Sequence, residues 1–256
     1  MTTSDWLSPR NRPLNLGHRG ASAAAPQNTL AAFRKAVEMG ADGVELDVQL
    51  SADGVPVVIH DFTVNKTTSG TGRVADKTLA ELKALDAGSK FSPHFAGERI
   101  PTLAEVFEAI DGKLLVNVEL KAPSHNWNTA LVGPVLETVR RHGMQTKVLF
   151  SSFNSHMLRA MKQLAPGIPA GVLYEPDSPV YVRRAWLDPF VPHEARHPHR
   201  TMLTGPIVGW YHAHGLRVNT WTVDDPAEMR RHIDTGVDSI ITNKPDVLKS
   251  VLQARQ

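Results

Sequence analysis

Two short apolar runs carry acidic residues on one of their faces. Glu45 and Asp47 lie two positions apart within residues 43–50, and Glu119 lies within residues 114–121. Side chains two positions apart on a β-strand point to the same side, so these acids face away from their apolar neighbours. Three carboxylates that converge in a partly desolvated place repel one another and favour protonation unless a cation is present. Because oxygen ligands suit hard cations, the sequence predicts one divalent cation, Mg²⁺ or Ca²⁺, bound by Glu45, Asp47 and Glu119.

Two histidines and two basic residues accompany these acids. His18 and His60 each end an apolar run. Imidazole titrates near neutral pH, so one histidine can act as general base and the other as general acid. Arg19 offers a planar fork of donors that suits phosphate, and Lys121 adds a second positive charge. The combination predicts metal-assisted cleavage of a phosphate ester.

The elements that would position these residues form a regular series. Apolar runs alternate with segments of helical period, which open at capping signals such as Thr78, Thr102 and Asp225-Pro226. The runs predict nine strands: residues 14–18, 43–50, 55–60, 114–121, 148–152, 170–174, 190–193, 216–223 and 239–242.

One of the nine runs is a hairpin partner. The turn Ser51-Ala52-Asp53-Gly54 is too short for a crossover helix, and Asp-Gly is a hairpin signal. Residues 55–60 should therefore return antiparallel to residues 43–50, with His60 beside Glu45 to within about a residue. Eight runs remain, which predicts an α/β fold, a (β/α)8 TIM barrel, with active-site residues at the carboxyl ends of its strands.

Two long connections interrupt this pattern. Residues 62–100 follow the hairpin and are too long for a plain loop, so we predict a small inserted subdomain over the barrel mouth, within a single domain of residues 1–256. Residues 189–199, rich in proline and histidine, predict a second irregular region.

Composition excludes several classes of protein. The chain has no cysteine, so zinc fingers, iron–sulfur sites and thiol nucleophiles are excluded. Its 28 basic and 26 acidic residues leave a formal net charge of +2, which argues against a nucleic-acid partner. There is no signal-peptide pattern near the start and no apolar run of about 18 residues, so we expect a cytoplasmic protein without stable membrane insertion.

The same residues also have ordinary structural interpretations. The acids and the lysine of the two strands could form a buried salt-bridge network that only supports the barrel. Asn219 and Trp221 share one strand face, where a ligand wall and core filling are about equally common. A further group of histidines is interpreted as part of solvated loops and not as a metal cluster: His193, His197, His199, His212 and His214.

Taken together, the motifs resemble those of the glycerophosphodiester phosphodiesterases, in their short, single-domain bacterial form. The resemblance covers Leu14 to Leu248. It is carried by Gly17-His18-Arg19-Gly20, Pro26-Gln27-Asn28-Thr29, Glu45-Leu46-Asp47-Val48, His60-Asp61, Thr67-Thr68 with Gly70 and Gly72, Ile100-Pro101-Thr102-Leu103, Glu119-Leu120-Lys121, Ser151-Ser152-Phe153, Trp221-Thr222-Val223 and Thr242-Asn243-Lys244-Pro245-Asp246.

The resemblance implies a role for each candidate. Glu45, Asp47 and Glu119 would be the metal ligands, His18 and His60 the acid/base pair, Arg19 and Lys121 the phosphate clamp, and Trp221 a wall for the glycerol or alcohol end. The implied substrate is a glycerophosphodiester, such as glycerophosphocholine or glycerophosphoethanolamine, which is cleaved to sn-glycerol-3-phosphate and an alcohol. The nucleophile, water or the substrate's own 2-hydroxyl, is left open.

Two positions depart from the family's pattern: Gln27 replaces a usual glutamate, and Lys66 replaces a common arginine.

Two other functions are weighed. One is a lysophospholipase D-like hydrolase of lysophospholipids, and the other is a phosphate-ligand binding barrel without catalysis.

Overall fold

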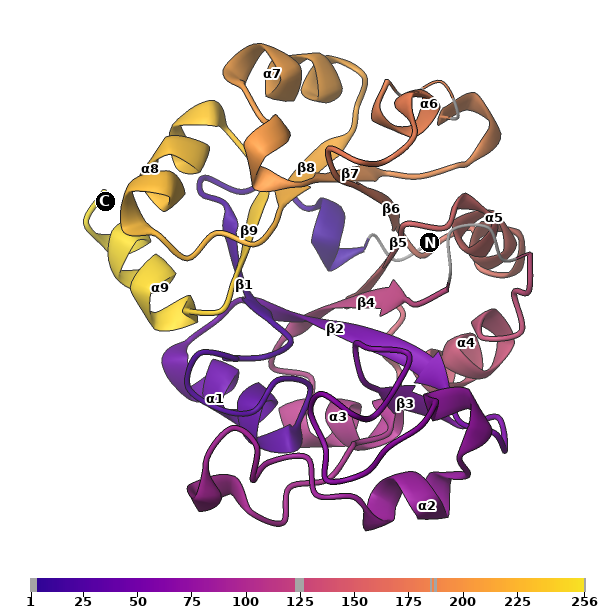
Figure 1. The fold of residues 1–256 in the computed structure, drawn as a ribbon. Coiled ribbons are helices and arrows are strands. Elements are labelled where there is room, and N and C mark those ends of the chain that lie inside the picture. Colours follow the sequence, from indigo (N-terminus) through magenta and orange to yellow (C-terminus); the bar gives the residue numbers. More distant parts are fainter. Residues whose placement is uncertain (1–3, 123–126, 185, 187, 256) are drawn as a thin grey trace.

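Eight parallel strands close into a barrel in the computed structural model, which describes residues 4–122, 127–184, 186 and 188–255 (Figure 1). The order around the barrel is β1-β9-β8-β7-β6-β5-β4-β2, and pairing of β1 with β2 closes the ring. The predicted (β/α)8 TIM barrel is confirmed. Its strands are β1 (Leu14–His18), β2 (Gly43–Leu50), β4 (Leu115–Leu120), β5 (Val148–Ser152), β6 (Ala170–Tyr174), β7 (Ala195–Pro198), β8 (Arg217–Thr220) and β9 (Ser239–Thr242).

The hairpin return is strand β3 (Pro56–Val58), antiparallel to β2. Its register pairs Val48 with Val58, one residue away from the predicted alignment. The paired part ends at Val58, so β3 is shorter than the predicted run 55–60 and His60 lies beyond it.

The predicted strand at residues 190–193 is wrong. The sixth barrel strand is β7, which lies within the stretch that we expected to be irregular. Both faces of this strand carry a buried polar side chain. The guanidinium carbon of Arg196 lies 4.6 Å from the centre of the Tyr174 ring, and His197 is buried inside the barrel. An apolar run is therefore no guide to this strand. The interpretation of His197 as part of a solvated loop is also wrong, because this residue lies in β7 and is fully buried.

Helices cover the outside of the barrel and begin where the capping signals predict. Thr78 and Thr102 each form a complete capping box, and Asp225 caps a helix that begins at Pro226. The helices are α1 (Leu30–Met39), α2 (Leu79–Ala84), α3 (Leu103–Ile110), α4 (Val132–Arg141), α5 (Ser155–Leu164), α6 (Val180–Arg183), α7 (Gly205–Ala213), α8 (Pro226–Thr235) and α9 (Pro245–Gln253). Short 3₁₀ turns are Asp5–Leu7, Val74–Asp76, Pro93–Phe95, Asp188–Phe190 and Arg200–Met202.

The two faces of the strands have different surroundings. Outward residues such as Val44, Leu46 and Val118 pack against the helices in the main apolar core. Inward residues form a smaller apolar cluster near the amino ends of the strands, where Trp6 packs with Leu14 and Leu149. The inward positions toward the carboxyl ends are left to polar residues, as expected for the catalytic end of this fold.

Residues 62–100 follow the hairpin and contain α2 and two of the 3₁₀ turns. Val64, Val74 and Leu82 form a small apolar cluster with Val57 and Ile59 at the edge of the barrel. This segment is anchored to the barrel through the hairpin strand.

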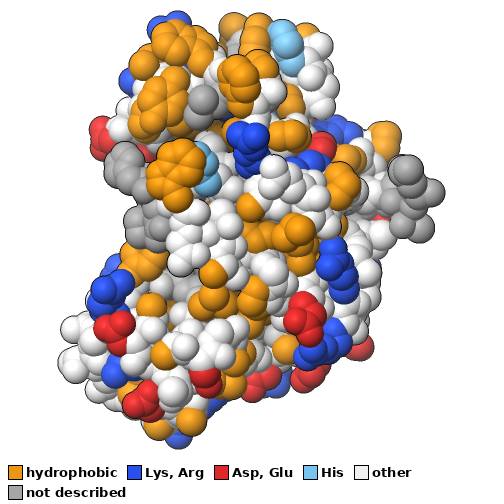
Figure 2. All heavy atoms as spheres, turned by 90° about the vertical axis from the view of Figure 1, so that its right-hand side faces the viewer, with side chains coloured by type: hydrophobic (Ala, Val, Ile, Leu, Met, Phe, Trp, Pro, Cys, Tyr) orange, Lys and Arg blue, Asp and Glu red, His pale blue; other side chains and the backbone are white. Residues whose placement is uncertain are grey.

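Exposed hydrophobic side chains gather on one side of the surface, over the segments of α6 and α7 at the top of Figure 2. The large exposed ones there are Val180, Tyr181, Trp186, Phe190, Ile207 and Trp210. No helix within the described part of the chain is long and apolar enough to cross a membrane.

Candidate active site

Three buried carboxylates meet inside the barrel. Glu45 and Asp47 project from β2 and Glu119 from β4, whose register places Asp47 directly beside Glu119. One oxygen of each lies within 4.8 Å of the others, and the three residues are at most 9% exposed. Among the residues that the structure describes, this is the one group of three acids or histidines close enough to hold a metal ion.

Burial and mutual repulsion act on the protonation of these acids. Burial raises the pKa of Glu45 well above its usual range, and the neighbouring charges of Asp47 and Glu119 raise it further. Burial also raises the pKa of Glu119. Burial opposes ionisation of Asp47 too, but Arg19 and Lys121 outweigh it and hold that pKa below its usual value. The three acids thus outnumber the two neighbouring cations, and their carboxylate oxygens are the ligands that a hard divalent cation prefers.

Two cations reach into the same cluster. Arg19 Nε lies 3.2 Å from Asp47 Oδ2, and Lys121 Nζ lies 2.9 Å from Glu119 Oε1 and 3.5 Å from Asp47 Oδ1. The salt-bridge network that we weighed as a structural alternative therefore exists. It leaves Asp47 Oδ1 without a hydrogen-bond donor among the described residues, so the network does not saturate the acids.

The loop after β1 orients Arg19. Arg19 and Asn28 both adopt positive φ angles, 54° and 58°, and a backbone hydrogen bond from Asn28 to Arg19 joins them. Asn28 Nδ2 donates to Asp47 Oδ2 at 2.9 Å. The neutral Gln27 accepts from Arg19 Nη1 at 2.7 Å, so this departure leaves the guanidinium charge uncompensated at that end. Lys66, the other departure, lies with Gln27 in the wall of a neighbouring cavity of about 440 Å³.

His18 ends β1 and is held by a neutral partner. Its Nδ1 lies 2.7 Å from Asn243 Oδ1, and Asn243 Nδ2 in turn donates to Asp224 Oδ2 at 2.6 Å. Since the amide oxygen only accepts, His18 Nδ1 carries the proton and Nε2 is free of it. Nε2 lies 3.9 Å from Glu45. Burial and the charge of Arg19 lower the pKa of His18 to about 4, so its neutral, basic form prevails at neutral pH.

His60 has a charged partner instead. Its Nδ1 lies 2.7 Å from Asp61 Oδ1, and both side chains are about one-third exposed. Burial lowers the pKa of His60, whereas Asp47 and Asp61 act to raise it. A carboxylate on Nδ1 stabilises an imidazolium, which an amide does not.

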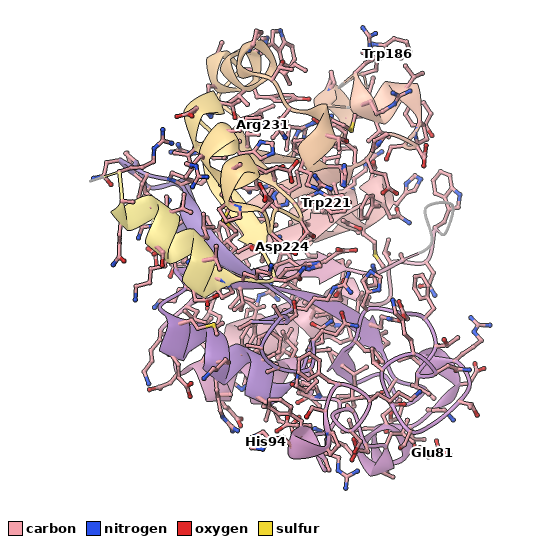
Figure 3. All side chains as sticks on the ribbon, turned by 60° about the vertical axis from the view of Figure 1, so that its left-hand side comes forward. Glu81, His94, Trp186, Trp221, Asp224 and Arg231 are labelled. Atoms are coloured by element: carbon pink, nitrogen blue, oxygen red, sulfur yellow. The ribbon has the colours of Figure 1, made fainter. Side chains whose placement is uncertain are left out.

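Both histidines, Arg19, Lys121 and two of the three acids line one cavity of about 320 Å³ at the carboxyl ends of the strands. Trp221, on the segment after β8, stands edge-on to Phe153 with ring centres 5.7 Å apart, and its Nε1 donates to the His197 carbonyl. Figure 3 shows Trp221 and Asp224 toward the middle of the molecule, whereas Glu81 and His94 lie at its lower edge. The cavity is lined by His18, Arg19, Glu45, His60, Asn117, Glu119, Lys121, Ser151, Phe153, Leu173, Glu175, Trp221, Thr222 and Ile241.

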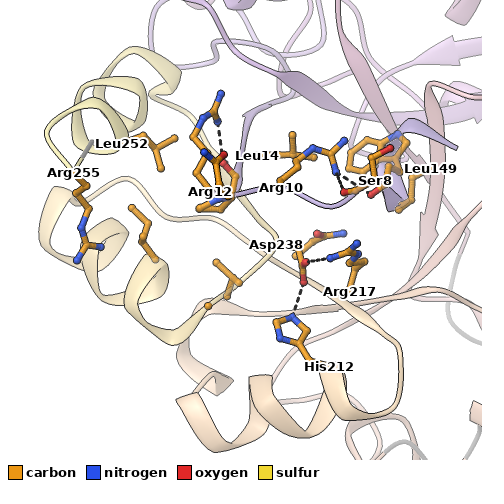
Figure 4. Close-up of a pocket in the computed structure, with 17 residues that line it drawn as sticks. Ser8, Arg10, Arg12, Leu14, Leu149, His212, Arg217, Asp238, Leu252 and Arg255 are labelled. Atoms are coloured by element: carbon orange, nitrogen blue, oxygen red, sulfur yellow. Dashed lines mark hydrogen bonds and ion pairs between the residues drawn. The ribbon is translucent and has the colours of Figure 1, made fainter.

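A larger cavity, of about 510 Å³, lies elsewhere (Figure 4). It is near the amino ends of β1, β5 and β8 and is rich in arginine. Arg217 and His212 pair with Asp238, Arg12 pairs with Asp42, and Arg10 donates to backbone carbonyls. It lacks the convergence of acids, imidazoles and cations that the smaller cavity has.

Sequence reasoning missed the partners of the histidines and one wall of the cavity. Asn243 and Glu175 each follow directly after a correctly predicted strand, so their position at the catalytic end of the barrel could have been inferred from the sequence. Asp61 adjoins His60 in the chain. Asp224 gave no comparable signal, because its contact with Asn243 depends on the packing of two loops.

Comparisons with known proteins agree with this geometry. A sequence model of the glycerophosphoryl diester phosphodiesterase family matches residues 18–247. A glycerophosphodiester phosphodiesterase of Caldanaerobacter subterraneus is 42% identical over 248 residues, which cover 94% of this chain and 98% of the relative. Another, from Bacillus subtilis, is 33% identical and covers 96% of this chain and 88% of the relative.

Solved structures give the same result. A phosphodiesterase of Oleispira antarctica, in complex with the product sn-glycerol-3-phosphate, superposes with a TM-score of 0.87 at 32% identity, covering 94% of this chain and 97% of that one. A glycerophosphodiester phosphodiesterase of Agrobacterium tumefaciens superposes with a TM-score of 0.81 at 31% identity, covering 93% and 99%.

The fold, the cavity and the solved relatives identify the class of protein, which is a TIM-barrel phosphoric diester hydrolase. The chain belongs to the glycerophosphoryl diester phosphodiesterase family, and its enzyme class is glycerophosphodiester phosphodiesterase.

Proposed function

We propose that this protein hydrolyses glycerophosphodiesters, such as glycerophosphocholine or glycerophosphoethanolamine, to sn-glycerol-3-phosphate and an alcohol. The observation that carries the proposal is one cavity lined by Glu45 and Glu119 of the buried acid cluster, two cations and two histidines with different partners. The Oleispira relative, captured with sn-glycerol-3-phosphate, supports this choice of product.

Glu45, Asp47 and Glu119 would hold one divalent cation, Mg²⁺ or Ca²⁺. A cation held there would supply Lewis-acid chemistry, by polarising a phosphoryl oxygen and lowering the pKa of the nucleophile. The fit rests on three carboxylate oxygens within 4.8 Å of one another and on an Asp47 oxygen that lacks a hydrogen-bond donor among the described residues. Arg19 and Lys121 bind the phosphate and stabilise the negative charge that grows on it in the transition state.

The two histidines divide the proton transfers according to their partners. His18 accepts at Nε2 the proton of the nucleophile, water or the substrate's 2-hydroxyl, because its Nδ1–H is tied to Asn243. His60 donates a proton to the departing alcohol oxygen as the phosphorus–oxygen bond breaks, because Asp61 stabilises its protonated form. Trp221 forms a wall for the organic part of the substrate.

Residues 62–100 form, in this proposal, one inserted subdomain over the barrel mouth of a single domain of residues 1–256. The small cluster around Val64 and Leu82 supports this division, as does the place of Lys66 and Thr67 in a cavity wall next to Gln27. The cytoplasmic location and the lack of a nucleic-acid partner stay predictions from the sequence.

Removal of either histidine tests the function. We expect His18→Ala and His60→Ala to lower turnover of glycerophosphocholine by about 10²-fold or more, the usual scale for a general acid or base. Circular dichroism should show that both variants stay folded. Near-normal rates in both would disprove the assignment. Loss of rate together with loss of fold would assign the residues to structure only.

A second candidate, hydrolysis of lysophospholipids, is favoured by one observation. Exposed aromatic side chains on α6, α7 and the segment that follows α6 form an apolar surface (Figure 2). Such a surface suits contact with lipid aggregates. Comparing lysophosphatidylcholine with glycerophosphocholine decides between the two, because only the lipid carries an acyl chain.

A further inference from the structure

One wall of the catalytic cavity carries a carboxylate that the mechanism above does not use. Glu175 follows the end of β6 directly and lines the cavity with Phe153 and Trp221. Its backbone N–H donates to Ser178 Oγ, which fixes the turn. Its carboxylate makes no salt bridge or hydrogen bond with any residue in the described part of the chain.

The barrel places Glu175 opposite Arg19 in the ring of strands. In the closed ring of eight strands, β6 is four strands from β1 in either direction. Arg19 follows β1, and Lys121 follows β4, which is two strands from β6. One of the two ester groups of a phosphodiester whose phosphate contacts Arg19 and Lys121 can therefore reach across the cavity toward Glu175.

Aromatic rings accompany the carboxylate on that wall. Trp221 stands edge-on to Phe153 at 5.7 Å and to His199 at 5.1 Å between ring centres. Indole and phenyl faces attract alkylammonium groups, and a nearby carboxylate adds to this attraction. His199 does not neutralise Glu175: burial and the charge of Arg200 lower the pKa of His199, so its neutral form prevails at neutral pH.

We propose that Glu175, Trp221 and Phe153 form a subsite for the alkylammonium head group of the substrate. This inference rests on the proposed function and narrows it to diesters of cationic amino alcohols, with a quaternary or a primary ammonium. Such a substrate carries a negative phosphate and a positive group a few bonds apart. Arg19 and Lys121 offer cationic partners for the phosphate on the side of β1 and β4, and Glu175 offers a carboxylate for the ammonium group on the side of β6.

A pair of matched substrates tests the subsite. One is glycerophosphocholine, and the other is its neutral isostere, in which 3,3-dimethylbutanol replaces choline and a carbon atom replaces the nitrogen. We expect kcat/KM to favour the cationic ester by about fivefold, the upper range for a solvent-exposed ion pair. In Glu175→Gln the ratio should fall toward one, because kcat/KM should fall for the cationic ester and stay unchanged for the neutral ester.

Asp177→Asn is the matched control. Asp177 is exposed on the same turn, carries the same charge and does not line the cavity. The ratio in this variant should equal that of the wild type. A wild-type ratio near one, or the same ratio in Glu175→Gln as in the wild type, overturns the proposal. An equal fall of the ratio in both variants also overturns it, because the effect would then be one of net charge.

Binding keeps the subsite separate from the reaction. Isothermal titration calorimetry, on the protein without added divalent cation, measures the dissociation constant of each ester. The ratio of these two constants gives the preference for the cationic ester without hydrolysis. A cationic preference that disappears in Glu175→Gln supports the subsite even if neither ester is hydrolysed, which would be a failure of the proposed function alone. Equal affinities of the wild type for the two esters overturn the subsite even if both are hydrolysed.

Discussion

The partner of His60 offers the sharpest perturbation of the proposed proton transfers. In Asp61→Asn, a neutral amide replaces a carboxylate whose Oδ1 lies 2.7 Å from His60 Nδ1. The substitution keeps the size and shape of the side chain. It removes the charge that stabilises the protonated, proton-donating form of His60.

The size of the effect follows from distance and exposure. Coulomb's law gives about 1.5 kcal/mol for opposite unit charges at this distance in water. Screening by water is the appropriate limit, because the His60 and Asp61 side chains are 32% and 27% exposed. The loss corresponds to about one pKa unit. The pKa of His60, already lowered by burial, should therefore fall further by about one unit.

The direction of the pH dependence is fixed by the role of the acid. A general acid works only when protonated, so activity falls as pH rises through its pKa. In Asp61→Asn the alkaline limb of the kcat profile should move to lower pH by about one unit. Turnover of glycerophosphocholine on that limb should fall about tenfold. At pH values below the alkaline limbs of both the wild type and the variant, turnover should change little.

Leaving-group chemistry supplies the control. p-Nitrophenolate departs without a proton, so the p-nitrophenyl ester of glycerol phosphate should lose little rate in Asp61→Asn, whereas the choline ester loses about tenfold. Asp61→Glu keeps the carboxylate and should restore most of the rate. An unmoved alkaline limb, or equal losses for both esters, would refute the assignment of His60 as the acid.

Three further predictions concern the cation, the phosphate clamp and the buried histidine of β7. Chelation should abolish activity, Mg²⁺ or Ca²⁺ should restore it, and the cation should raise Tm in the wild type but not in Asp47→Asn, as thermal unfolding would show. Lys121→Met should lower kcat by about 10²-fold, measured beside the surface control Lys35→Met; an equal effect in both would contradict the clamp. Burial lowers the pKa of His197 to about 3, so its neutral form stabilises the fold above pH 6.5 and this contribution is lost as pH falls toward 3. Denaturant titrations at pH 7 and pH 4.5 should therefore show an acid-induced loss about 3 kcal/mol smaller in His197→Gln than in the wild type.

The sequence predicted the parts of the fold that repeat a simple pattern. Strands such as β2 and β9 are apolar runs, and the helices after Thr78 and Thr102 open at capping boxes, so their position follows from local physics. Strand β7 does not, because Arg196 and His197 are buried only through partners that are distant in sequence. Local patterns do not reveal such long-range compensation.

The site divides in the same way. The alternation of acids on β2 and β4 places Glu45, Asp47 and Glu119 correctly, since strand geometry alone aligns them. The hydrogen bond that Asn243 accepts from His18 depends on how two loops pack, and no spacing in the chain specifies it. Residues on strands were thus predictable, and those that orient them were only partly so.

Hydrolysis itself can be followed by ³¹P NMR with purified protein and glycerophosphocholine, first without divalent cation and then with Mg²⁺ or Ca²⁺. Our account predicts that the diester signal is replaced by that of sn-glycerol-3-phosphate only when the cation is present, and that Asp47→Asn shows no conversion. Conversion without cation, a product in which phosphate stays on choline, or no conversion under any condition would contradict it.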